Sequence, residues 1–228
     1  NMGLRALTIE EGDDLIGADI ADGSSEIILS TAKGMACRFV ESDVRTMGRG
    51  ARGVTGIRFK LEGDYIVSME VVPGSGVAAD MPELDESAEA PAEEEVADAV
   101  ETTAEDADSE EGEVIEDSGR PQLLVVSSGG MGKRSYVENY RLTRRGAKGV
   151  KNLNLREGEE VIAAVQIKHG DELIITTERG QVSRISVDEI RIVGRASKGV
   201  KIMDLRKGDR ITGVSRIVEV EGAASMSD

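Results

Sequence analysis

The 228-residue chain contains one cysteine, one histidine and no tryptophan. The single cysteine, Cys37, excludes an internal disulfide framework and a cysteine-based metal site. No apolar run approaches the roughly 18 residues that a membrane-spanning helix needs, and no signal-peptide pattern opens the sequence. These absences predict a cytoplasmic protein with no membrane contact.

Residue patterns typical of catalysis are also missing. The single histidine, His169, gives little basis for a histidine-led catalytic cluster. There is no glycine-rich nucleotide-binding motif after a strand, no zinc-ligand spacing and no Ser/His/Asp set. We therefore expect no catalytic residue, no metal ligand and no cofactor in this chain. Cys37 is interpreted as a small packed hydrophobe, and His169, beside Gly170, as a solvated turn residue.

The formal net charge of −16 is concentrated in one segment. Ala78–Gly119 holds 18 of the 44 acidic residues and no Lys or Arg, so 26 acidic and 28 basic residues remain elsewhere. The four prolines all flank or lie within this segment. High charge and few large apolar residues leave too little burial to offset chain entropy. We predict that 78–119 is a disordered acidic insertion.

The rest of the chain is repetitive. Four Gly-Val or Gly-Leu pairs begin at Gly3, Gly53, Gly149 and Gly199, with spacings of 50, 96 and 50 residues. The long spacing is one 50-residue period plus 46 residues, close to the length of the acidic segment. The acidic segment therefore interrupts a series of repeats of about 50 residues.

Each repeat has the same order of short apolar segments. A first strand, a turn glycine and a second strand with a central arginine precede a basic loop, a short third strand and a fourth strand. The predicted first strands are Glu26–Thr31, Gln122–Ser127 and Asp171–Thr177, and the predicted fourth strands are Leu15–Ile20, Tyr65–Val72, Val161–Ile167 and Ile211–Val218. Four short strands per repeat predict an all-β, propeller-like fold of four-stranded blades.

This repeat pattern divides the chain into about three and a half blades. The expected divisions are 1–22 as the end of a blade, 23–77 as a blade, 78–119 as the insertion, 120–170 and 171–222 as blades, and 223–228 as a tail.

Three acid-free basic windows recur at equivalent positions. They lie between Asp43 and Glu62, between Glu138 and Glu157, and between Glu189 and Asp204. Glycines beside the arginines let the backbone approach an anion closely. A periodic positive stripe suits a bent polyanion that is bound through its phosphates. The predicted DNA-binding residues are Arg45, Arg49, Arg52, Lys133, Arg134, Arg141, Arg144, Arg145, Lys148, Arg191, Arg195 and Lys198.

Other interpretations stay open at this point. The strand arginines Arg38, Arg134 and Arg184 suit either DNA binding or a structural pair with a carboxylate of the neighbouring blade. A kelch-like propeller that binds proteins would also repeat near 50 residues, but three Tyr, two Phe and no Trp argue against it. An enzyme on a propeller is disfavoured because no polar set converges.

Several segments resemble the C-terminal β-pinwheel domain of the A subunit of DNA gyrase, which is a type IIA topoisomerase. The resemblance lies in Glu26–Phe39, Glu41–Arg45, Gly132–Arg134, Tyr140–Val150, Asp171–Gly180 and Ile190–Arg195. It implies a six-bladed ring that wraps duplex DNA so that the holoenzyme introduces negative supercoils. It also implies that ATP and Mg²⁺ bind elsewhere, that the cleaving tyrosine belongs to the N-terminal part of gyrase A, and that gyrase B is a partner. The related domain of topoisomerase IV is the nearest alternative.

Two features depart from that family's pattern. The family's basic box, Gln-Arg-Arg-Gly-Gly-Lys-Gly, is matched at five of seven positions by Thr143–Gly149, but in a later blade, so its role is not transferred. The acidic insertion is not part of the common pattern. Two roles stay open for the insertion, a solvated tether and a competitor for the phosphate sites.

Overall fold

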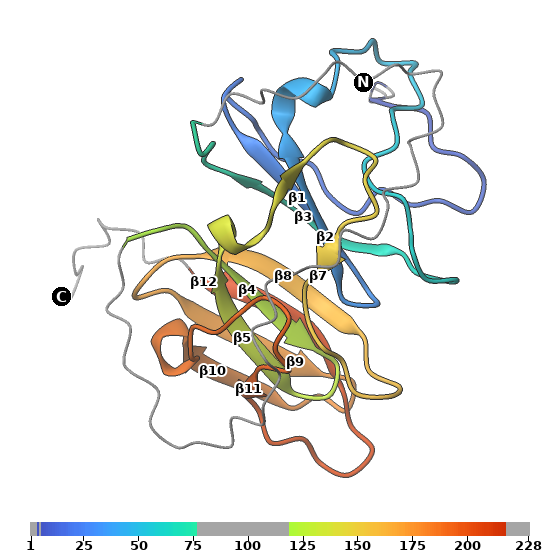
Figure 1. Cartoon of the computed structure of the whole chain (residues 1–228). Coiled ribbons are helices and arrows are strands. Elements are labelled where there is room, and N and C mark those ends of the chain that lie inside the picture. Colours follow the sequence, from blue (N-terminus) through green and yellow to red (C-terminus); the bar gives the residue numbers. More distant parts are fainter. Residues whose placement is uncertain (1–3, 5, 77–118, 218–228) are drawn as a thin grey trace, which may run out of the picture. The chain divides into compact units, whose positions relative to one another are not determined.

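The structure is a computed structural model that describes residues 4, 6–76 and 119–217 (Figure 1). The chain divides into two compact units, one of residues 1–76 with 117–228 and the other of residues 77–116. The second unit lies outside the described residues. The same holds for nearly all of the predicted insertion at 78–119 and for the predicted tail at 223–228, so both stay predictions. All residues that the structure describes belong to the first unit.

Short strands in three sheets make up most of the regular structure in this unit (Figure 1). The first blade contains β1 (Glu26–Thr31), β2 (Met35–Val40) and β3 (Ile66–Val72). The second contains β4 (Gln122–Ser127), β5 (Met131–Tyr136) and β8 (Val161–Ile167). The third contains β9 (Glu172–Thr177), β10 (Val182–Ser186) and β12 (Ile211–Ile217). The all-β prediction is confirmed, and first and fourth strands form within one residue of their expected bounds in these blades.

Three single-turn 3-10 helices follow the second strands. They are η1 (Glu41–Asp43), η2 (Val137–Asn139) and η3 (Val187–Glu189). Three two-residue strands lie in or after the basic loops: β6 (Leu142–Thr143), β7 (Val150–Lys151) and β11 (Val200–Lys201).

The two-residue strands belong to the sheet of the preceding blade. The first sheet runs β3-β1-β2-β6 with β7 also on β2, the second runs β8-β4-β5-β11, and the third runs β12-β9-β10. Val150 pairs with Ala36, and Val200 pairs with Gly132. The sequence prediction assigned the third strand to its own blade, and this assignment is wrong. Two residues carry no periodicity from which their pairing partner could be read.

The predicted strand Leu15–Ile20 does not form. Residues 6–25 contain no strand, and Leu15, Ile16 and Ile20 are all more than half exposed. Each fourth strand that does form pairs with the first strand of its own blade, as β3 does with β1. The described residues before Leu15 contain no first strand that could pair with this apolar segment and complete a ladder.

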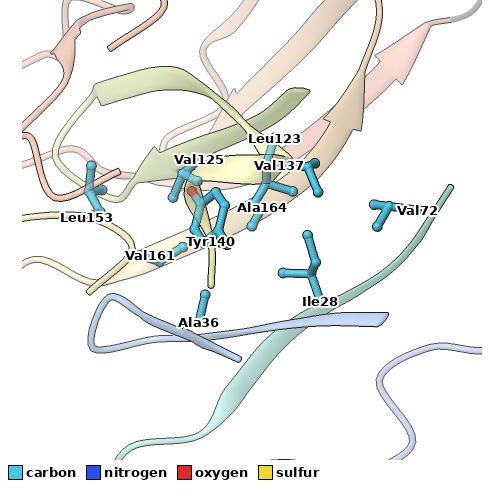
Figure 2. Close-up of a cluster of buried hydrophobic side chains, with 10 residues drawn as sticks. All are labelled: Ile28, Ala36, Val72, Leu123, Val125, Val137, Tyr140, Leu153, Val161 and Ala164. Carbon is cyan, nitrogen blue, oxygen red and sulfur yellow. The ribbon is translucent and has the colours of Figure 1, made fainter. Parts of the chain in front are cut away.

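Neighbouring blades share their apolar cores. One cluster joins Ile28 and Val72 of the first blade to Leu123 and Tyr140 of the second (Figure 2). A second cluster joins Leu124 of the second blade to residues of the third, including Leu173 and Ile175. Alternate side chains of β4 therefore face opposite neighbours, because successive residues of a strand point to opposite faces. This explains why β4 is buried along its whole length and reads as a continuous apolar run.

Two glycines of the repeated Gly-Val pairs allow a close approach between blades. Gly149 has φ +74°, and a Cβ there would lie 2.5 Å from the carbonyl oxygen of Ala36. Gly199 has φ +77°, and its Cβ would lie 2.6 Å from the carbonyl oxygen of Gly132. No L side chain fits these positions unless the backbone shifts, so glycine is required where each two-residue strand begins.

We expect Gly149→Ala to destabilise the fold more than Gly158→Ala. Both glycines have positive φ, +74° and +79°, but a Cβ at Gly158 meets nothing within 4 Å. Gly158→Ala should cost only the left-handed backbone strain, about 1–2 kcal/mol. Gly149→Ala should cost clearly more, because the β2–β7 pairing must also open. Chemical denaturation of the two variants measures the difference, and equal losses would contradict the close-approach explanation.

Candidate nucleic-acid interface

One backbone hydrogen bond recurs between the loops of successive repeats. In each case an amide N–H of one repeat donates to a carbonyl in the basic loop of the next repeat, at 3.0–3.2 Å. The three bonds join Thr8 to Ala51, Arg58 to Ala147, and Asn154 to Ser197. The basic windows of consecutive repeats are therefore joined into one continuous series.

Two of the predicted DNA-binding arginines reinforce this series. The Arg145 guanidinium donates to the carbonyl of Thr55 at 2.8 Å, and Arg195 donates to the carbonyl of Lys151 at 3.0 Å. The two arginines are one 50-residue period apart, and both acceptors lie in the preceding window. Each arginine is half-buried and acts first as a clamp between two loops.

Asp43 binds the start of the second basic loop. Its carboxylate lies 3.5 Å from the Arg144 guanidinium and accepts from the Arg145 backbone N–H at 3.2 Å. Its carbonyl accepts from Arg145 Nε at 3.0 Å. Part of the positive charge at 144–145 is therefore balanced within the protein.

The remaining predicted loop residues are exposed. They occupy two repeated positions, Arg45, Arg141 and Arg191 at one and Arg52, Lys148 and Lys198 at the other, together with Arg49. Arg52 lies 3.3 Å from Glu10, and both side chains are mostly exposed, a kind of pair that contributes little to stability. These two positions present the positive charge of the loops at the surface.

The same windows contain exposed basic residues that the predicted set omitted. Arg58, Lys60 and Lys151 are exposed. Lys151 lies at the position equivalent to Thr55 and Lys201, directly after the glycine-valine pair. The recurrence of a lysine at this repeat position, Lys151 and Lys201, could have predicted that Lys151 belongs to the basic surface.

Lys133 and Arg134 require a correction. Lys133 is fully buried, and Arg134 is 8% exposed, so neither side chain presents its charge at the surface. Burial along β5 is almost continuous, because both of its faces pack against neighbours. Neither side chain can therefore reach a phosphate at the surface.

The strand arginines join one blade to the 3-10 turn of the next. Arg38 Nε lies 2.5 Å from the Glu26 carboxylate, and its Nη1 donates to the carbonyls of Val137 and Tyr140 at 3.0 and 2.9 Å. Burial alone would raise the pKa of Glu26, but hydrogen bonds from Ser75 and the Arg38 contact outweigh it and lower that pKa. Glu26 is therefore ionised at neutral pH, and the pair is fully charged.

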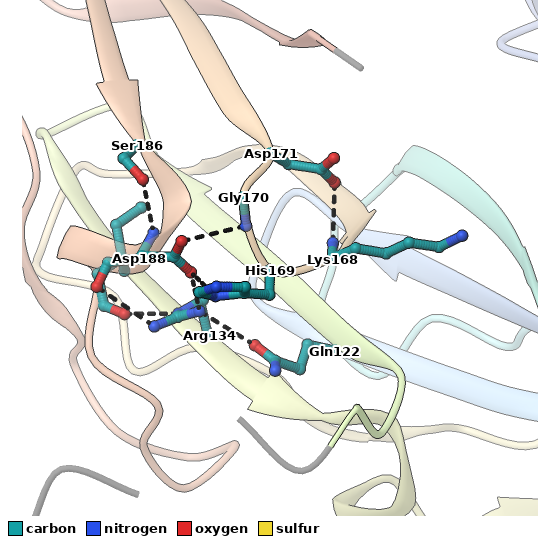
Figure 3. Close-up of polar contacts among 9 residues, drawn as sticks. Gln122, Arg134, Lys168, His169, Gly170, Asp171, Ser186 and Asp188 are labelled. Atoms are coloured by element: carbon teal, nitrogen blue, oxygen red, sulfur yellow. Dashed lines mark hydrogen bonds and ion pairs between the residues drawn. The ribbon is translucent and has the colours of Figure 1, made fainter. Parts of the chain in front are cut away.

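Arg134 makes the equivalent connection to the third blade (Figure 3). Its Nε donates to the carbonyl of Ile190 at 2.6 Å, and its Nη1 lies 3.3 Å from Asp188 and 3.4 Å from Gln122. Asp188 also lies 3.0 Å from His169 Nδ1, and His169 is mostly exposed. Of the two interpretations of the strand arginines, these contacts support the structural one for Arg38 and Arg134.

The described residues contain little that suits other chemistry. Burial raises the pKa of the Cys37 thiol, so the reactive thiolate is disfavoured. Burial likewise raises the pKa of Tyr140 above its ordinary value. Within 6–76 and 119–217 no group of three or more His, Cys, Asp or Glu side chains could hold a metal ion. The helices in those ranges all fall short of the length and hydropathy that a membrane span requires.

Repeated sheets that exchange a short outer strand, with basic loops joined in series, define a bladed β domain with a surface suited to a polyanion. The family model described as "DNA gyrase C-terminal domain, beta-propeller" matches residues 1–22, 25–73, 121–168 and 171–217. The chain belongs to this family, which confirms the resemblance drawn from its segments.

Two curated relatives are named as the A subunit of DNA gyrase. The protein of Deinococcus deserti is 34% identical over 183 residues, which cover 75% of this chain and 22% of the relative. The protein of Chlamydia trachomatis is 34% identical over 174 residues, which cover 75% of this chain and 15% of the relative. This chain thus spans 22% or less of the length of either relative.

Two solved structures share the fold. The C-terminal domain of DNA topoisomerase IV aligns with a TM-score of 0.67 at 22% identity, over 92% of this chain and 52% of that one. A DNA gyrase A C-terminal domain aligns with the same TM-score and identity, over 95% of this chain and 58% of that one.

We expect Arg38→Met to destabilise the fold far more than Arg184→Met. Both arginines face a carboxylate twelve residues earlier, Glu26 or Glu172, but Arg38 is buried and the Arg184 side chain is 63% exposed. Arg38→Met leaves Glu26 without its cationic partner, a change that costs about 3–5 kcal/mol in buried pairs. Arg184→Met should cost less than about 1 kcal/mol. Urea denaturation tests this, and similar losses would contradict the structural role of Arg38.

Proposed function

We propose that this chain binds duplex DNA without sequence preference and, within a longer gyrase A protein, serves to wrap DNA. The observation that carries the proposal is the repeated hydrogen bond that joins the basic loops of consecutive repeats. It places the two exposed basic positions of each loop in a regular series. Phosphates follow one another at a regular spacing along duplex DNA, so a regular series of cations suits them.

The proposed contacts are to phosphates rather than to base edges. The described helices are single turns, which are too short to enter the major groove as a recognition helix. The exposed loop residues are mainly arginines and lysines beside glycines, and the basic windows hold a single exposed aromatic, Phe59, which is too few to stack on successive bases. Phosphate contacts position a protein on DNA but carry no sequence information.

The wider assignments follow from the longer relatives. We propose that gyrase B and the N-terminal part of gyrase A are partners, that ATP and Mg²⁺ act on those regions, and that this chain has no catalytic residue or cofactor of its own. A cytoplasmic location belongs to the same proposal. The corresponding part of topoisomerase IV is the second candidate, because its C-terminal domain aligns with the same TM-score. The names of the two curated relatives favour gyrase.

DNA binding should weaken steeply with salt. If five or six phosphates are neutralised, the logarithm of the binding constant should fall against the logarithm of salt concentration with a slope of roughly −5. Fluorescence anisotropy with duplexes of unrelated sequence, at several salt concentrations, measures the slope and the sequence preference. A slope near zero, or strong preference for one duplex, would overturn the phosphate-binding proposal.

Replacing the three residues at one exposed position should weaken binding without destabilising the fold. The variant is Arg52→Ala with Lys148→Ala and Lys198→Ala, which removes one cation per basic loop. The salt slope should become less steep by about one for each lost phosphate contact, and the melting temperature should hardly change, since exposed charges add little stability.

A matched variant separates direct binding from loop support. Arg145→Ala with Arg195→Ala removes the two loop clamps, so it should lower the melting temperature as well as DNA affinity. Lys168→Ala removes an exposed lysine outside the basic windows and should change the salt slope little. If the triple variant melts like the clamp variant, the exposed residues are structural and the proposed interface is wrong.

A further inference from the structure

Lys133 is a fully buried lysine whose ammonium contacts only uncharged oxygens. Its Nζ donates to the carbonyl of Arg195 at 2.6 Å, to Ser135 Oγ at 2.8 Å and to the carbonyl of Gly194 at 3.3 Å. Among the residues that the structure describes, no carboxylate contacts this ammonium. Burying a cation without a counter-charge costs free energy. Apolar packing does not account for a lysine at this position of β5, so its presence there must be explained by what its hydrogen bonds hold in place.

The two carbonyls belong to the third basic loop, residues 190–203. Ser135 Oγ donates to the carbonyl of Val193 at 2.7 Å, so Lys133 and Ser135 together bind three consecutive carbonyls of this loop. The loop carries the exposed Arg191 and Lys198 on either side of this attachment. The attachment therefore fixes the backbone from which two proposed phosphate contacts project.

The equivalent position in the first blade faces the equivalent part of the second loop. Cys37 lies one repeat before Lys133, and its Sγ is 3.6 Å from Thr143 Oγ1 and 4.0 Å from the carbonyl of Arg144. Arg144 is the counterpart of Gly194. This position of the second strand thus contacts the next blade's basic loop in both repeats, and only Lys133 donates strong hydrogen bonds there.

We propose that Lys133 is a positioning residue that holds the third basic loop in its DNA-binding conformation, and that protonation of its amine loosens this loop. The loosening of the loop on protonation is a property of the protein alone and is argued from proton linkage. The effect of the loop on DNA binding rests on the proposed function. The loop conformation and the DNA binding are therefore tested by separate measurements, and either can fail without the other.

The direction of the pH effect follows from burial. Desolvation, and to a smaller extent the charge of Arg195, lowers the pKa of Lys133 to about 7. When the loop opens and the amine meets water, its pKa returns toward the ordinary value of 10.5. The open loop therefore binds the proton more tightly, so opening becomes easier as pH falls from 10.5 toward about 7, and changes little below about 7. The neutral amine keeps two N–H groups, enough for the two short contacts, to Arg195 and Ser135.

The groups that face Lys133 are few. Among the described residues, the charge of Arg195 adds to the lowering of the Lys133 pKa, and Ser135 lowers the pKa of Tyr140, whose hydroxyl donates to Asn152 at 2.6 Å. Burial raises the pKa of Tyr140, which therefore stays neutral near pH 7. A pH response of the loop that Lys133→Met abolishes is therefore assigned to Lys133.

Amide hydrogen exchange of the 228-residue chain tests the proposal directly. The Val193 and Ser197 amides close the loop by donating to the carbonyls of Arg134 and Gly194 at 2.9 and 3.1 Å. In the unaltered chain, their exchange, corrected for the intrinsic pH effect, should speed up as pH falls from about 9 to about 7 and should level off below that. In Lys133→Met it should be at least about tenfold faster at pH 8, from the lost hydrogen bonds, and should not respond to pH.

Two controls accompany this measurement. Lys168→Met removes an exposed lysine of the same blade and should leave both amides unchanged. Lys133→Cys places at position 133 the residue found at position 37, and serves if the Met variant does not fold. A flat pH profile in the unaltered chain, or unchanged protection in folded Lys133→Met or Lys133→Cys, would overturn the proposal.

DNA binding separates positioning from direct contact. At pH 8, Lys133→Met should weaken DNA binding by roughly two- to tenfold, the cost of ordering the loop side chains again on binding, while the salt slope stays the same. Lys198→Ala should instead make the slope less steep by about one. A less steep slope in Lys133→Met would show a direct phosphate contact and contradict the positioning role. If the unaltered chain binds no DNA, the proposed function fails, and the exchange data still decide whether Lys133 positions the loop.

Discussion

The short strand that each repeat adds to the preceding sheet determines where the basic loops lie. β7 pairs with β2 and β11 pairs with β5, each directly after a basic loop. A loop that ends in another blade's sheet has one end fixed relative to that blade. The hydrogen bonds from Arg58 and Asn154 then fix the middle of each loop. No single bond of this kind contributes more than about 1.5 kcal/mol, but together they set the spacing of the exposed cations.

Most of the fold could be predicted from the sequence because its signals are local. Strands such as β1, β4 and β8 show strand-length apolar runs or alternation between glycine turns, and the 50-residue period identifies equivalent strands. The pairing of each two-residue strand with the preceding blade could not be predicted. Val150 pairs with Ala36, which is far away in the chain, and a strand of two residues has no periodicity that indicates its partner. Leu15–Ile20 is as apolar as the other fourth strands, but no first strand of its own repeat lies among the described residues to pair with it.

The candidate site was predictable as windows but not residue by residue. The distribution of charged residues identified the three basic loops. It does not distinguish Arg145 from Lys148, since each is one positive charge in the same loop. In the structure, Arg145 donates to the carbonyl of Thr55, whereas Lys148 is exposed. The difference lies in which carbonyl faces the side chain, and that depends on a contact between repeats. A better signal existed for Lys133: its counterparts are Cys37 and Ser183, small residues that suit a buried position better than a surface one.

The division of labour between arginine and lysine has a physical basis. A guanidinium stays charged and carries five donors in a rigid fork, so it can satisfy several carbonyls at once, as Arg38 does. Buried arginine contacts are little screened by salt, whereas exposed cations such as Lys148 and Lys198 are strongly screened. Salt can therefore weaken binding of a polyanion to the loops without loosening the blades that present them. Lys133 is the fully buried lysine among the described residues. Unlike an arginine, a buried lysine can lose its charge near neutral pH. Its amine binds the backbone of the third basic loop.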